Sequence, residues 1–472
     1  MKAVHPTRTE HDLLGEHEVP VDVYYGVHTA RALLNFPISG VPISRHPDLV
    51  VALASVKQAA AMANRQLGQL DAAIAEAIVS ACVEIRGGAL HEQFVVDQIQ
   101  GGAGTSTNMN ANEVIANRAC ELLGHERGSY HIVHPLEHVN LGQSTNDVYP
   151  TAVKIALGTA TRTLEQALRG LADHCSTKSL EFAGMLKLGR TQLQDAVPMT
   201  LGQEFGAFAV TILEDADRLA EASTLIAEIN LGGTAIGTGI NTHPEYAALV
   251  CDHLRTITGL PLTTASNLVE ATSDVGAFVQ LSGVAKRSAV KLSKICNDLR
   301  LLSSGPRAGL GEINLPSVQA GSSIMPGKVN PVIPEVVNQV AFEVIGNDLT
   351  VTMAAEAGQL QLNAFEPIIA RALLSSLNHL TAAVHVLGER CVAGITANAD
   401  RMRDAVLQSA SLATALNPVL GYEAATALVA EAIATGASIP ELVRRSALVD
   451  DAVLARVLSP ENLCGPGDPR AR

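Results

Sequence analysis

Tryptophan is absent from the 472 residues, and aromatic residues make up only 3% of them. A β-sandwich needs aromatic and β-branched residues in its strands, so this composition disfavours that class of fold. Alanine and leucine recur instead, which favours helices that pack closely through small side chains. The chain is too long for one compact core, and we expect two to four domains.

Positive charge is also scarce, because 33 Lys and Arg residues face 47 Asp and Glu residues and leave a net charge of -14. This balance argues against nucleic acid as a partner. It also gives no long-range attraction for an anionic substrate. An anion site would therefore have to be built locally, from a few cationic side chains and helix N-termini.

The seven cysteines are scattered and form no CxxC pair. An odd, dispersed set in a long chain predicts free thiols in a reducing compartment. The N-terminal stretch MKAVHPTRTEHD lacks the apolar run of a signal peptide, and no later segment is long and apolar enough to span a bilayer. We therefore expect a cytoplasmic protein.

The pattern after the irregular first forty residues is helical. Short helices are expected at 48–68, 71–86 and 110–123, and again after about Asn398. Between them lie longer runs with few glycines and almost no prolines, which exceed the usual globular helix and indicate a bundle. Their long apolar stripes favour homo-oligomerisation. The five long runs are 145–182, 200–229, 273–303, 332–358 and 366–394.

Four polar, glycine-bearing stretches interrupt this background, and each lies shortly before an expected helix. Ser, Thr and Asn are preferred helix N-cap residues, so each stretch taken singly is explained by capping. Taken together, hydroxyls and amides at several helix N-termini suit a small molecule that carries carboxylates. No GxGxxG or P-loop pattern points to a nucleotide. The stretches are GGAGTSTNMNANE (101–113), GQSTNDVYPT (142–151), GRTQLQDAVP (189–198) and GSSIMPGKVNP (321–331).

The chemistry suggested by such a site is proton abstraction next to a carboxylate, with the carbanion held as an enediolate by hydrogen-bond donors and a lysine. A serine among backbone N–H groups and beside Lys328 is a candidate base. No Ser-His-Asp order and no metal-ligand spacing is apparent. The nearest metal candidate is His131, His134 and His138, but Pro135 interrupts that segment, and we interpret it as a loop of solvated histidines.

The fourth stretch resembles the signature loop of the fumarase/aspartase superfamily, and the other three match its remaining active-site segments in the same order. Within the superfamily the chain most resembles the aspartases, through EHDLLGEHEVPVDVYYGVHTARALLNF, ICNDLRLLSSGPRAGLGEINLPSVQAGSSIMPGKVNP and VTMAAEAGQLQLN. The resemblance implies a mainly all-α, three-domain fold with a central bundle of long helices and a tetrameric helical core. The domains would be 1–143, 144–397 and 398–472.

The resemblance also implies the reaction and its residues. The reaction would be the reversible, cofactor-independent deamination of L-aspartate to fumarate and ammonia, with each site assembled from three subunits of a homotetramer. Ser322 would take the Cβ proton, Lys328 and Asn330 would hold one carboxylate, and Ser323 would help from the loop. Gly321 and Gly327 would flank a segment that closes over the substrate. The other carboxylate and the amino group would be bound by Thr105, Ser144, Thr145, Asn146 and Thr191.

Gln192 stands where fumarases carry a histidine. Glutamine can hydrogen-bond but cannot shuttle a proton. Ammonium leaves as neutral ammonia, whereas hydroxide needs an acid, so Gln192 fits deamination better than dehydration. Glu335, whose fumarase counterpart supports that histidine, is expected to be structural or to orient a water.

Two other interpretations stay open. One is a sister lyase on the same scaffold, either a fumarase or a lyase of another amino-substituted succinate; Gln192 and the stretch YYGVHT count against fumarase. The other is a helical oligomer without catalysis, which predicts decay at Ser322, Lys328 or Asn330, and all three are intact. The segment HPLEHVN (134–140) differs from the fumarase secondary dicarboxylate site, so that site is not inferred. The sequence does not decide whether a divalent metal activates the enzyme.

Overall fold

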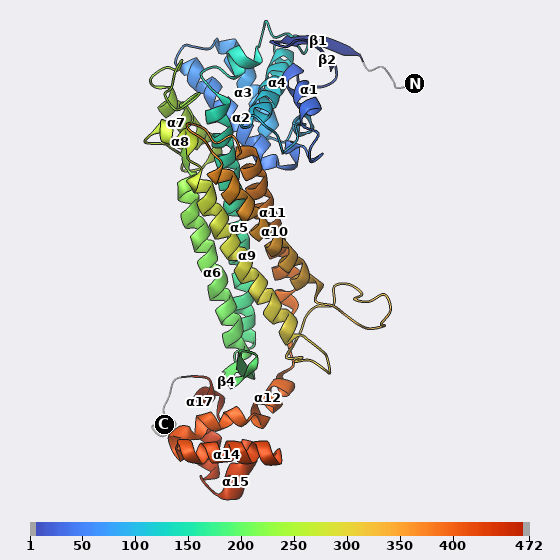
Figure 1. Ribbon diagram of the computed structural model, residues 1–472, viewed down its shortest axis with the longest axis vertical. Coiled ribbons are helices and arrows are strands. Elements are labelled where there is room, and N and C mark those ends of the chain that lie inside the picture. Colours follow the sequence, from blue (N-terminus) through green and yellow to red (C-terminus); the bar gives the residue numbers. More distant parts are fainter. Residues whose placement is uncertain (1–5, 466–472) are drawn as a thin grey trace. The chain divides into compact units, whose positions relative to one another are not determined.

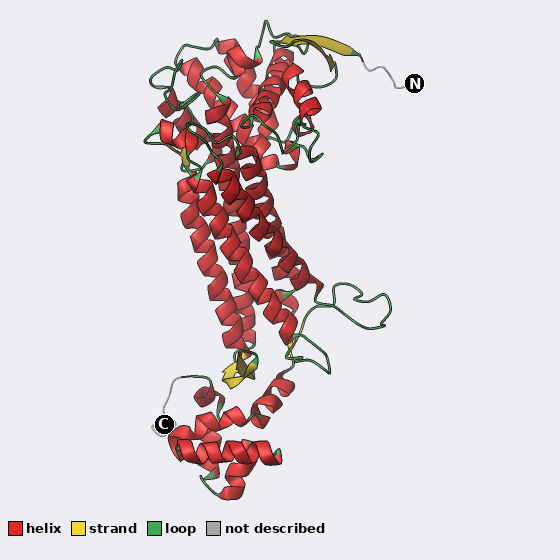
Figure 2. Cartoon of the chain, in the orientation of Figure 1, coloured by secondary structure: helices red, strands yellow, loops and turns green. Residues whose placement is uncertain are grey.

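The computed structural model describes residues 6–465, which form two compact units that are mainly helical (Figures 1 and 2). The first unit comprises the described chain up to Gln166, Ala216–Ala289 and Phe342–Thr381. The second comprises Ala167–Asp215, Val290–Ala341 and the described chain from Ala382. The division into 1–143, 144–397 and 398–472 stays a prediction.

Five long helices run through both sets of segments, so that each contributes one part to each unit. They confirm the five long runs predicted from the sequence. Apolar residues step by three or four positions along the third run, and all of them are buried, as the helical period requires: Phe278, Leu281, Ala285, Ala289, Leu292, Cys296 and Leu299. The helices are α5 (Thr145–Glu181), α6 (Leu201–Ile226), α9 (Gly276–Leu302), α10 (Val332–Glu356) and α11 (Glu366–Arg390).

The first unit is built around α2 (Pro47–Gln66), which packs against α3 (Ala72–Arg86) and α7 (Tyr246–Thr258). Six of the 14 buried residues of α2 are alanines, whose small side chains let neighbouring helices approach closely. The predicted helices at 48–68 and 71–86 are thereby confirmed. The remaining elements of this unit are β1 (Thr7–Asp12), β2 (Gly15–Pro20), α1 (Val27–Asn35), α4 (Thr105–Leu122), α8 (Leu268–Ser273) and the parallel pair β5 (Glu228–Ile229) and β6 (Thr263–Thr264).

The second unit gathers the short C-terminal helices around a hydrophobic core that includes Leu188 of β3. These helices confirm the predicted return to short helices after about Asn398. The elements are β3 (Leu186–Thr191), β4 (Gln194–Thr200), β7 (Ile313–Asn314), β8 (Thr396–Ala397), α12 (Ala399–Gln408), α13 (Asn417–Leu420), α14 (Tyr422–Thr435), α15 (Ile439–Ser446), α16 (Asp451–Val457) and α17 (Pro460–Leu463).

Two sequence expectations were incomplete near the N-terminus. The first forty residues contain an antiparallel hairpin, β1–β2, and helix α1, although prolines made the stretch look irregular. Helix α4 begins at Thr105 and not at 110, so the polar residues of the first stretch lie inside the helix. The N-terminal residues that concern the expected absence of a signal peptide lie partly outside the described range.

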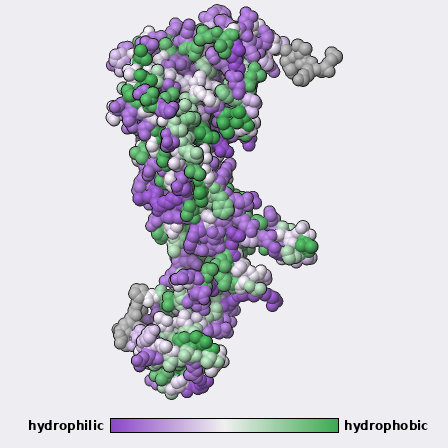
Figure 3. Space-filling model, in the orientation of Figure 1, coloured by the Kyte–Doolittle hydropathy of each residue, from purple (hydrophilic) through white to green (hydrophobic). Residues whose placement is uncertain are grey.

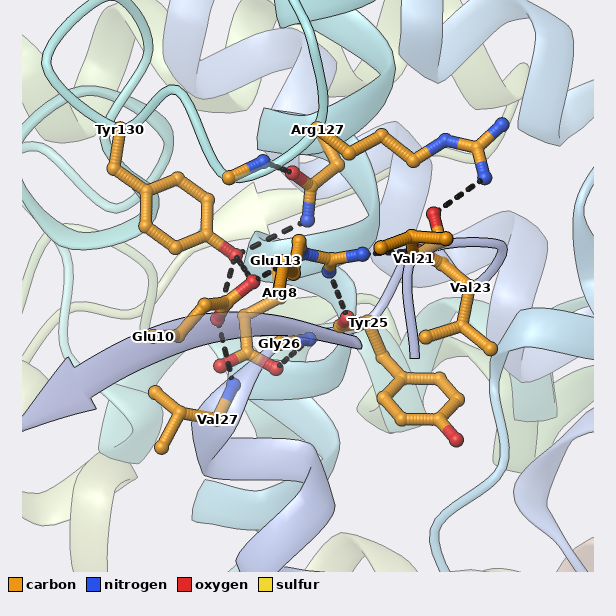
Figure 4. Close-up of polar contacts among 12 residues, drawn as sticks. Arg8, Glu10, Val21, Val23, Tyr25, Gly26, Val27, Glu113, Arg127 and Tyr130 are labelled. Carbon is orange, nitrogen blue, oxygen red and sulfur yellow. Dashed lines mark hydrogen bonds and ion pairs between the residues drawn. The ribbon is translucent and has the colours of Figure 1, made fainter. Parts of the chain in front are cut away.

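The stretch YYGVHT is held by a buried carboxylate, Glu113 of α4. Its oxygens accept hydrogen bonds from the backbone N–H groups of Gly26 (2.8 Å), His28 (2.8 Å) and Thr29 (3.1 Å), which lie at the start of α1. The Tyr130 hydroxyl contacts both oxygens of Glu10 at 3.1 Å, and a Cβ at Gly26 would meet Glu10, Tyr130 and Glu113 (Figure 4). Burial raises the pKa of Glu113 to about 7, although its hydrogen bonds oppose the shift.

All seven cysteines are free thiols and six are buried, as predicted from their spacing, while the reducing compartment stays a prediction. No single described helix is long and apolar enough to cross a membrane. Helices α14 and α15 reach the required length and apolarity only as a pair bent by 115°. Both contribute to the core of the second unit.

Replacing Glu113 with glutamine should destabilise the protein by about 1–3 kcal/mol, because an amide nitrogen would face a backbone donor in a buried site. The pKa of Glu113 is raised from 4.5 to about 7 in the folded state, so the folded wild type holds a proton there that the unfolded chain has lost. The stability that this extra proton contributes to the folded state is fully present below pH 4.5 and is lost as the pH rises through about 7. The wild-type advantage over E113Q should thus be larger at about pH 5.5 than at about pH 8.

Urea unfolding at fixed protein concentration measures both effects. Glu126→Gln, at an exposed glutamate 13 positions after Glu113, serves as the control and should match the wild type at both pH values. An advantage over E113Q that grows with rising pH would contradict the prediction.

Candidate functional site

The second polar stretch forms the N-terminus of α5, as predicted from its capping residues. The Ser144 hydroxyl accepts from the backbone N–H of Asn146 (3.3 Å), and Asp147 Oδ1 accepts from the N–H of Ser144 (2.9 Å). This reciprocal pair fixes the first turn of the helix. Ser144, Thr145 and Asn146 are half-buried there, next to one another.

Asp147 also joins this turn to a segment that sequence analysis missed. Its second oxygen, Oδ2, accepts from the backbone N–H groups of Gly232 (3.1 Å) and Thr234 (2.9 Å). The carboxylate is fully buried, and burial raises its pKa to about 6 while the backbone donors oppose the shift. The signal that could have revealed this segment is the glycine-rich run GGTAIGTG, in which Thr234 has a left-handed φ of 55°.

The same segment fixes the direction of the Asn146 amide. Asn146 Nδ2 donates to the carbonyl oxygen of Ala235 at 2.7 Å, and Asn230 Nδ2 donates to the backbone oxygen of Asn146 at 3.0 Å. Because the Asn146 nitrogen is engaged, its Oδ1 is the atom left to accept a hydrogen bond. An ammonium group is a suitable donor for it.

The first polar stretch lies at the start of α4, against the first turns of α5. Thr105 is exposed, and its hydroxyl donates to the oxygen of Gly102 at 2.7 Å. Gly104 has a φ of 90°, and a Cβ there would overlap the ring of Tyr149 in α5, so only glycine fits. One turn later, Asn108 Nδ2 donates to the Thr145 hydroxyl at 3.1 Å.

The third stretch forms the antiparallel hairpin β3–β4, an element that the sequence analysis did not predict. Gln192 and Leu193 occupy its tip with φ values of 54° and 63°, which two-residue hairpin turns of type I′ require. Thr191 and Gln192 are exposed. Glu312 forms ion pairs with two residues of strand β3, Lys187 (2.7 Å) and Arg190 (2.7 Å).

The fourth stretch is a closed loop between β7 and α10. The Gly321 N–H donates to the oxygen of Lys328 at 3.1 Å, and Asn330 Nδ2 donates to the oxygen of Gly321. The Ser322 hydroxyl oxygen accepts from the backbone N–H groups of Ile324 (3.2 Å) and Met325 (2.8 Å). This arrangement agrees with the expected serine among backbone N–H groups, which would stabilise negative charge on its oxygen.

The outer part of this loop is exposed. Ser323 and Lys328 face solvent, and no described residue pairs with the Lys328 ammonium group. Gly327 has a φ of 77°, whereas Gly321 lies where the loop closes on itself. Glu335 lies in the first turn of α10, and its predicted role remains untested.

The predicted site residues therefore fall into two groups. Thr105, Ser144, Thr145 and Asn146 come together in the first compact unit. The second unit holds the other group, which comprises Thr191, Gln192, Gly321, Ser322, Ser323, Gly327, Lys328 and Asn330.

The three histidines do not form a metal site. His134 Nδ1 accepts from the backbone N–H groups of Leu136 and Glu137 at the start of a π-helical turn (Pro135–Val139), and His138 Nδ1 accepts from the N–H of His134. His131 is exposed, while His134 and His138 are half-buried, so only His131 matches the expected solvated histidine. Within residues 6–465, no group of three or more His, Cys, Asp or Glu side chains could hold a metal ion.

Comparisons with known proteins identify the family of the chain. The family model described as "Lyase" matches residues 15–346, and the model for the fumarase C C-terminus matches residues 412–465. A curated relative from Pseudomonas aeruginosa, aspartate ammonia-lyase, is 60% identical over 467 residues, which cover 99% of this chain and 98% of the relative.

Solved structures show the same fold. A fumarate lyase:delta crystallin from Brucella melitensis, bound to cobalt, superposes with a TM-score of 0.95 at 57% identity, over 98% of this chain and 100% of that one. A class II fumarase from Schistosoma mansoni superposes with a TM-score of 0.91 at 36% identity, over 96% and 98% of the two chains. The chain belongs to the fumarase/aspartase superfamily of lyases.

Substituting Gly321 with alanine should open the base of the signature loop, because the new Cβ would lie 2.5 Å from the Lys328 oxygen. The expected result is faster tryptic cleavage after Lys328 than in the wild type. Gly327→Ala is the matched control: its Cβ meets open space, so only the strain of a left-handed alanine applies, about 1–2 kcal/mol. Equal cleavage rates in the two variants would refute a closing role for Gly321.

Proposed function

We propose that the chain catalyses the reversible deamination of L-aspartate to fumarate and ammonia, without a cofactor. The observation that carries this proposal is the intact signature loop, in which two backbone N–H groups hold the Ser322 hydroxyl oxygen, at 2.8 and 3.2 Å. The 60% identical relative named aspartate ammonia-lyase supports the choice of substrate. Gln192 at the hairpin tip supports ammonia over water as the leaving group.

In the proposed reaction, the Ser322 oxygen takes the proton from Cβ of L-aspartate. The electrons of the C–H bond move toward the adjacent carboxylate and form an enediolate, which hydrogen-bond donors stabilise. When the carboxylate re-forms, the double bond closes between Cβ and Cα and the C–N bond breaks. Its electron pair leaves with nitrogen, so ammonium departs as neutral ammonia and no further acid is required.

The binding residues divide by the chemistry that each can offer. Lys328 and Asn330 are proposed to hold one carboxylate, with Ser323 helping from the loop. Thr105, Ser144 and Thr145 are proposed to donate to the other. Asn146, whose Oδ1 is left to accept, is proposed to bind the amino group together with Thr191 and Gln192.

We further propose that the chain forms a homotetramer with sites shared between subunits. The two groups of site residues lie in different compact units, which makes a site built from several copies of the chain reasonable. Figure 3 shows apolar side chains on the molecular surface. On α10 they recur at helical spacing with about half of each side chain exposed, at Phe342, Ile345, Leu349 and Met353, and a second copy would cover them.

A cytoplasmic location is part of the proposal. It rests on the seven free thiols, because an oxidising compartment would favour their pairing. Whether a divalent metal activates the enzyme is a separate question, which a chelator titration of the purified protein would answer.

The reaction is tested by a paired assay in which the purified protein receives either L-aspartate or L-malate, with no cofactor. Fumarate formation, followed by ultraviolet absorbance, is expected from aspartate alone. Fumarate from malate would make the chain a fumarase and sink the argument from Gln192. Silence with both substrates would direct attention to other amino-substituted succinates.

The base is tested by Ser322→Ala, which should lower turnover of L-aspartate by about 10²–10⁴-fold because general base catalysis is lost. Ser317→Ala, at an exposed serine outside the motif, is the control and should keep wild-type turnover. Light scattering should give the mass of four chains for the wild type and both variants. Near-normal turnover by a folded S322A tetramer would remove serine from the base role.

A further inference from the structure

A buried polar network lies directly beneath the Thr145 hydroxyl, and the sequence analysis assigned no function to it. Its centre is the side-chain oxygen of Asn140, which accepts from Lys57 Nζ (2.8 Å), Asn108 Nδ2 (3.1 Å) and Asn112 Nδ2 (3.2 Å). The side chain of Asn108 then connects this centre to Thr145, whose Oγ1 lies 3.1 Å from Asn108 Nδ2. All five residues belong to the first compact unit.

The hydrogen bonds in this network can run in only one direction. An ammonium group donates and cannot accept, so Lys57 requires an oxygen from Asn140. Asn140 Nδ2 independently donates to the backbone oxygen of Gln143 at 3.2 Å, which orients the amide in the same way whatever the charge on Lys57. Asn108 therefore has to present its NH₂ group to Asn140, and the same nitrogen donates to Thr145.

Thr145 is consequently an acceptor toward the protein interior. Its hydroxyl hydrogen points away from Asn108, and no described residue accepts a hydrogen bond from it. A hydroxyl whose hydrogen has this orientation donates to a carboxylate without first breaking another hydrogen bond. Lys57 lies three hydrogen bonds from Thr145, and burial lowers its pKa to about 7. Its protonated form adds a local positive potential in a chain whose net charge is -14.

The network is costly for stability, which favours a functional explanation. Lys57 and Asn112 are fully buried and Asn108 is 2% exposed. The oxygens of both Asn108 and Asn112 are buried without a hydrogen-bond partner among the described residues, and each such group destabilises the fold. An apolar core at these positions would avoid that cost.

We propose that Asn108 is a positioning residue that fixes the Thr145 hydroxyl as a hydrogen-bond donor to the substrate carboxylate, with Asn140 and Lys57 setting the direction of the Asn108 amide. This inference rests on the proposed function, because it concerns the dicarboxylate bound at that site. Asn108 does not touch the substrate and acts through Thr145.

The test is a double-mutant cycle between Asn108 and Thr145. Asn108→Ala should lower kcat/KM for L-aspartate about tenfold, mainly through a higher KM, because a hydrogen bond to a charged group is weakened in the ground state and the transition state alike. In a Thr145→Val background, which lacks the hydroxyl, the same substitution should have almost no further effect. An undiminished loss in that background would overturn the proposal.

Asn112→Ala is the matched control, because Asn112 donates to the same Asn140 oxygen from the same helix but does not touch Thr145. It should share the loss of thermal stability and change kcat/KM far less than N108A. An equal fall in kcat/KM for both variants would mean that the network merely supports packing. If N108A does not fold, Asn108→Ser replaces it, since serine can satisfy its hydroxyl on its own helix and is too short to reach Thr145.

Fumarate affinity, measured by calorimetry on the wild type and the same variants, separates this proposal from the proposed reaction. Wild-type protein that binds fumarate but does not consume L-aspartate would refute the reaction, while the cycle in binding affinity still decides the role of Asn108. A tenfold weaker binding in N108A that disappears in the Thr145→Val background supports the positioning role. Unchanged fumarate affinity in N108A would refute it.

Discussion

The carboxylate of Asp147 is the constraint on which the first half of the candidate site depends. It is fully buried and accepts backbone N–H groups from Ser144, Gly232 and Thr234 at 2.9–3.1 Å, so it joins segments that lie 85 and 87 positions apart in the sequence. Burial opposes ionisation and raises its pKa to about 6, and the three donors oppose that shift. Because the contact fixes both the first turn of α5 and the segment that holds the Asn146 amide, the directions of Ser144 and Asn146 follow from one buried group. The Asn108 network fixes Thr145 between them.

The second half of the site is constrained in a different way. Glu312, 4% exposed, pairs with Lys187 and Arg190 of strand β3. Removing one partner from such desolvated pairs leaves an uncompensated buried charge, so these pairs hold β3 in place. The signature loop has no comparable anchor: its described hydrogen bonds are largely within the loop itself, and the Lys328 ammonium faces solvent. A hairpin held by ion pairs together with a loop held mainly by its own hydrogen bonds suits an enzyme that must first admit its substrate and then exclude water.

The long helices could be predicted because the same apolar spacing repeats many times. An apolar residue every three or four positions over 25 or more residues fits only an amphipathic helix, as the buried stripe of α9 shows. The four polar stretches were also identifiable, since their composition is foreign to a helical background. The hairpin tip at Gln192 was missed because neither Gln nor Leu is a usual turn residue with positive φ. Asn108 was placed before the helix expected at 110–123 and Asn112 inside it, so their spacing of four on one helical face was not recognised. The role of these buried amides also depends on Asn140 and Lys57, whose contacts with them, distant in sequence, only the structure shows.

The backbone at the hairpin tip bears on the choice between deamination and dehydration. Gln192 has a φ of 54°, a conformation that costs a residue with a Cβ about 1–2 kcal/mol and that persists only where the surrounding structure imposes it. Such strain is often found where the direction of a side chain matters, and the amide that it directs can donate and accept hydrogen bonds but cannot deliver a proton at neutral pH. The same holds for Thr191 and Asn146, so no side chain proposed to bind the leaving group is an acid. Ammonia leaves without an acid, whereas hydroxide needs one, so the proposed set of side chains fits a carbon–nitrogen lyase better than a hydratase.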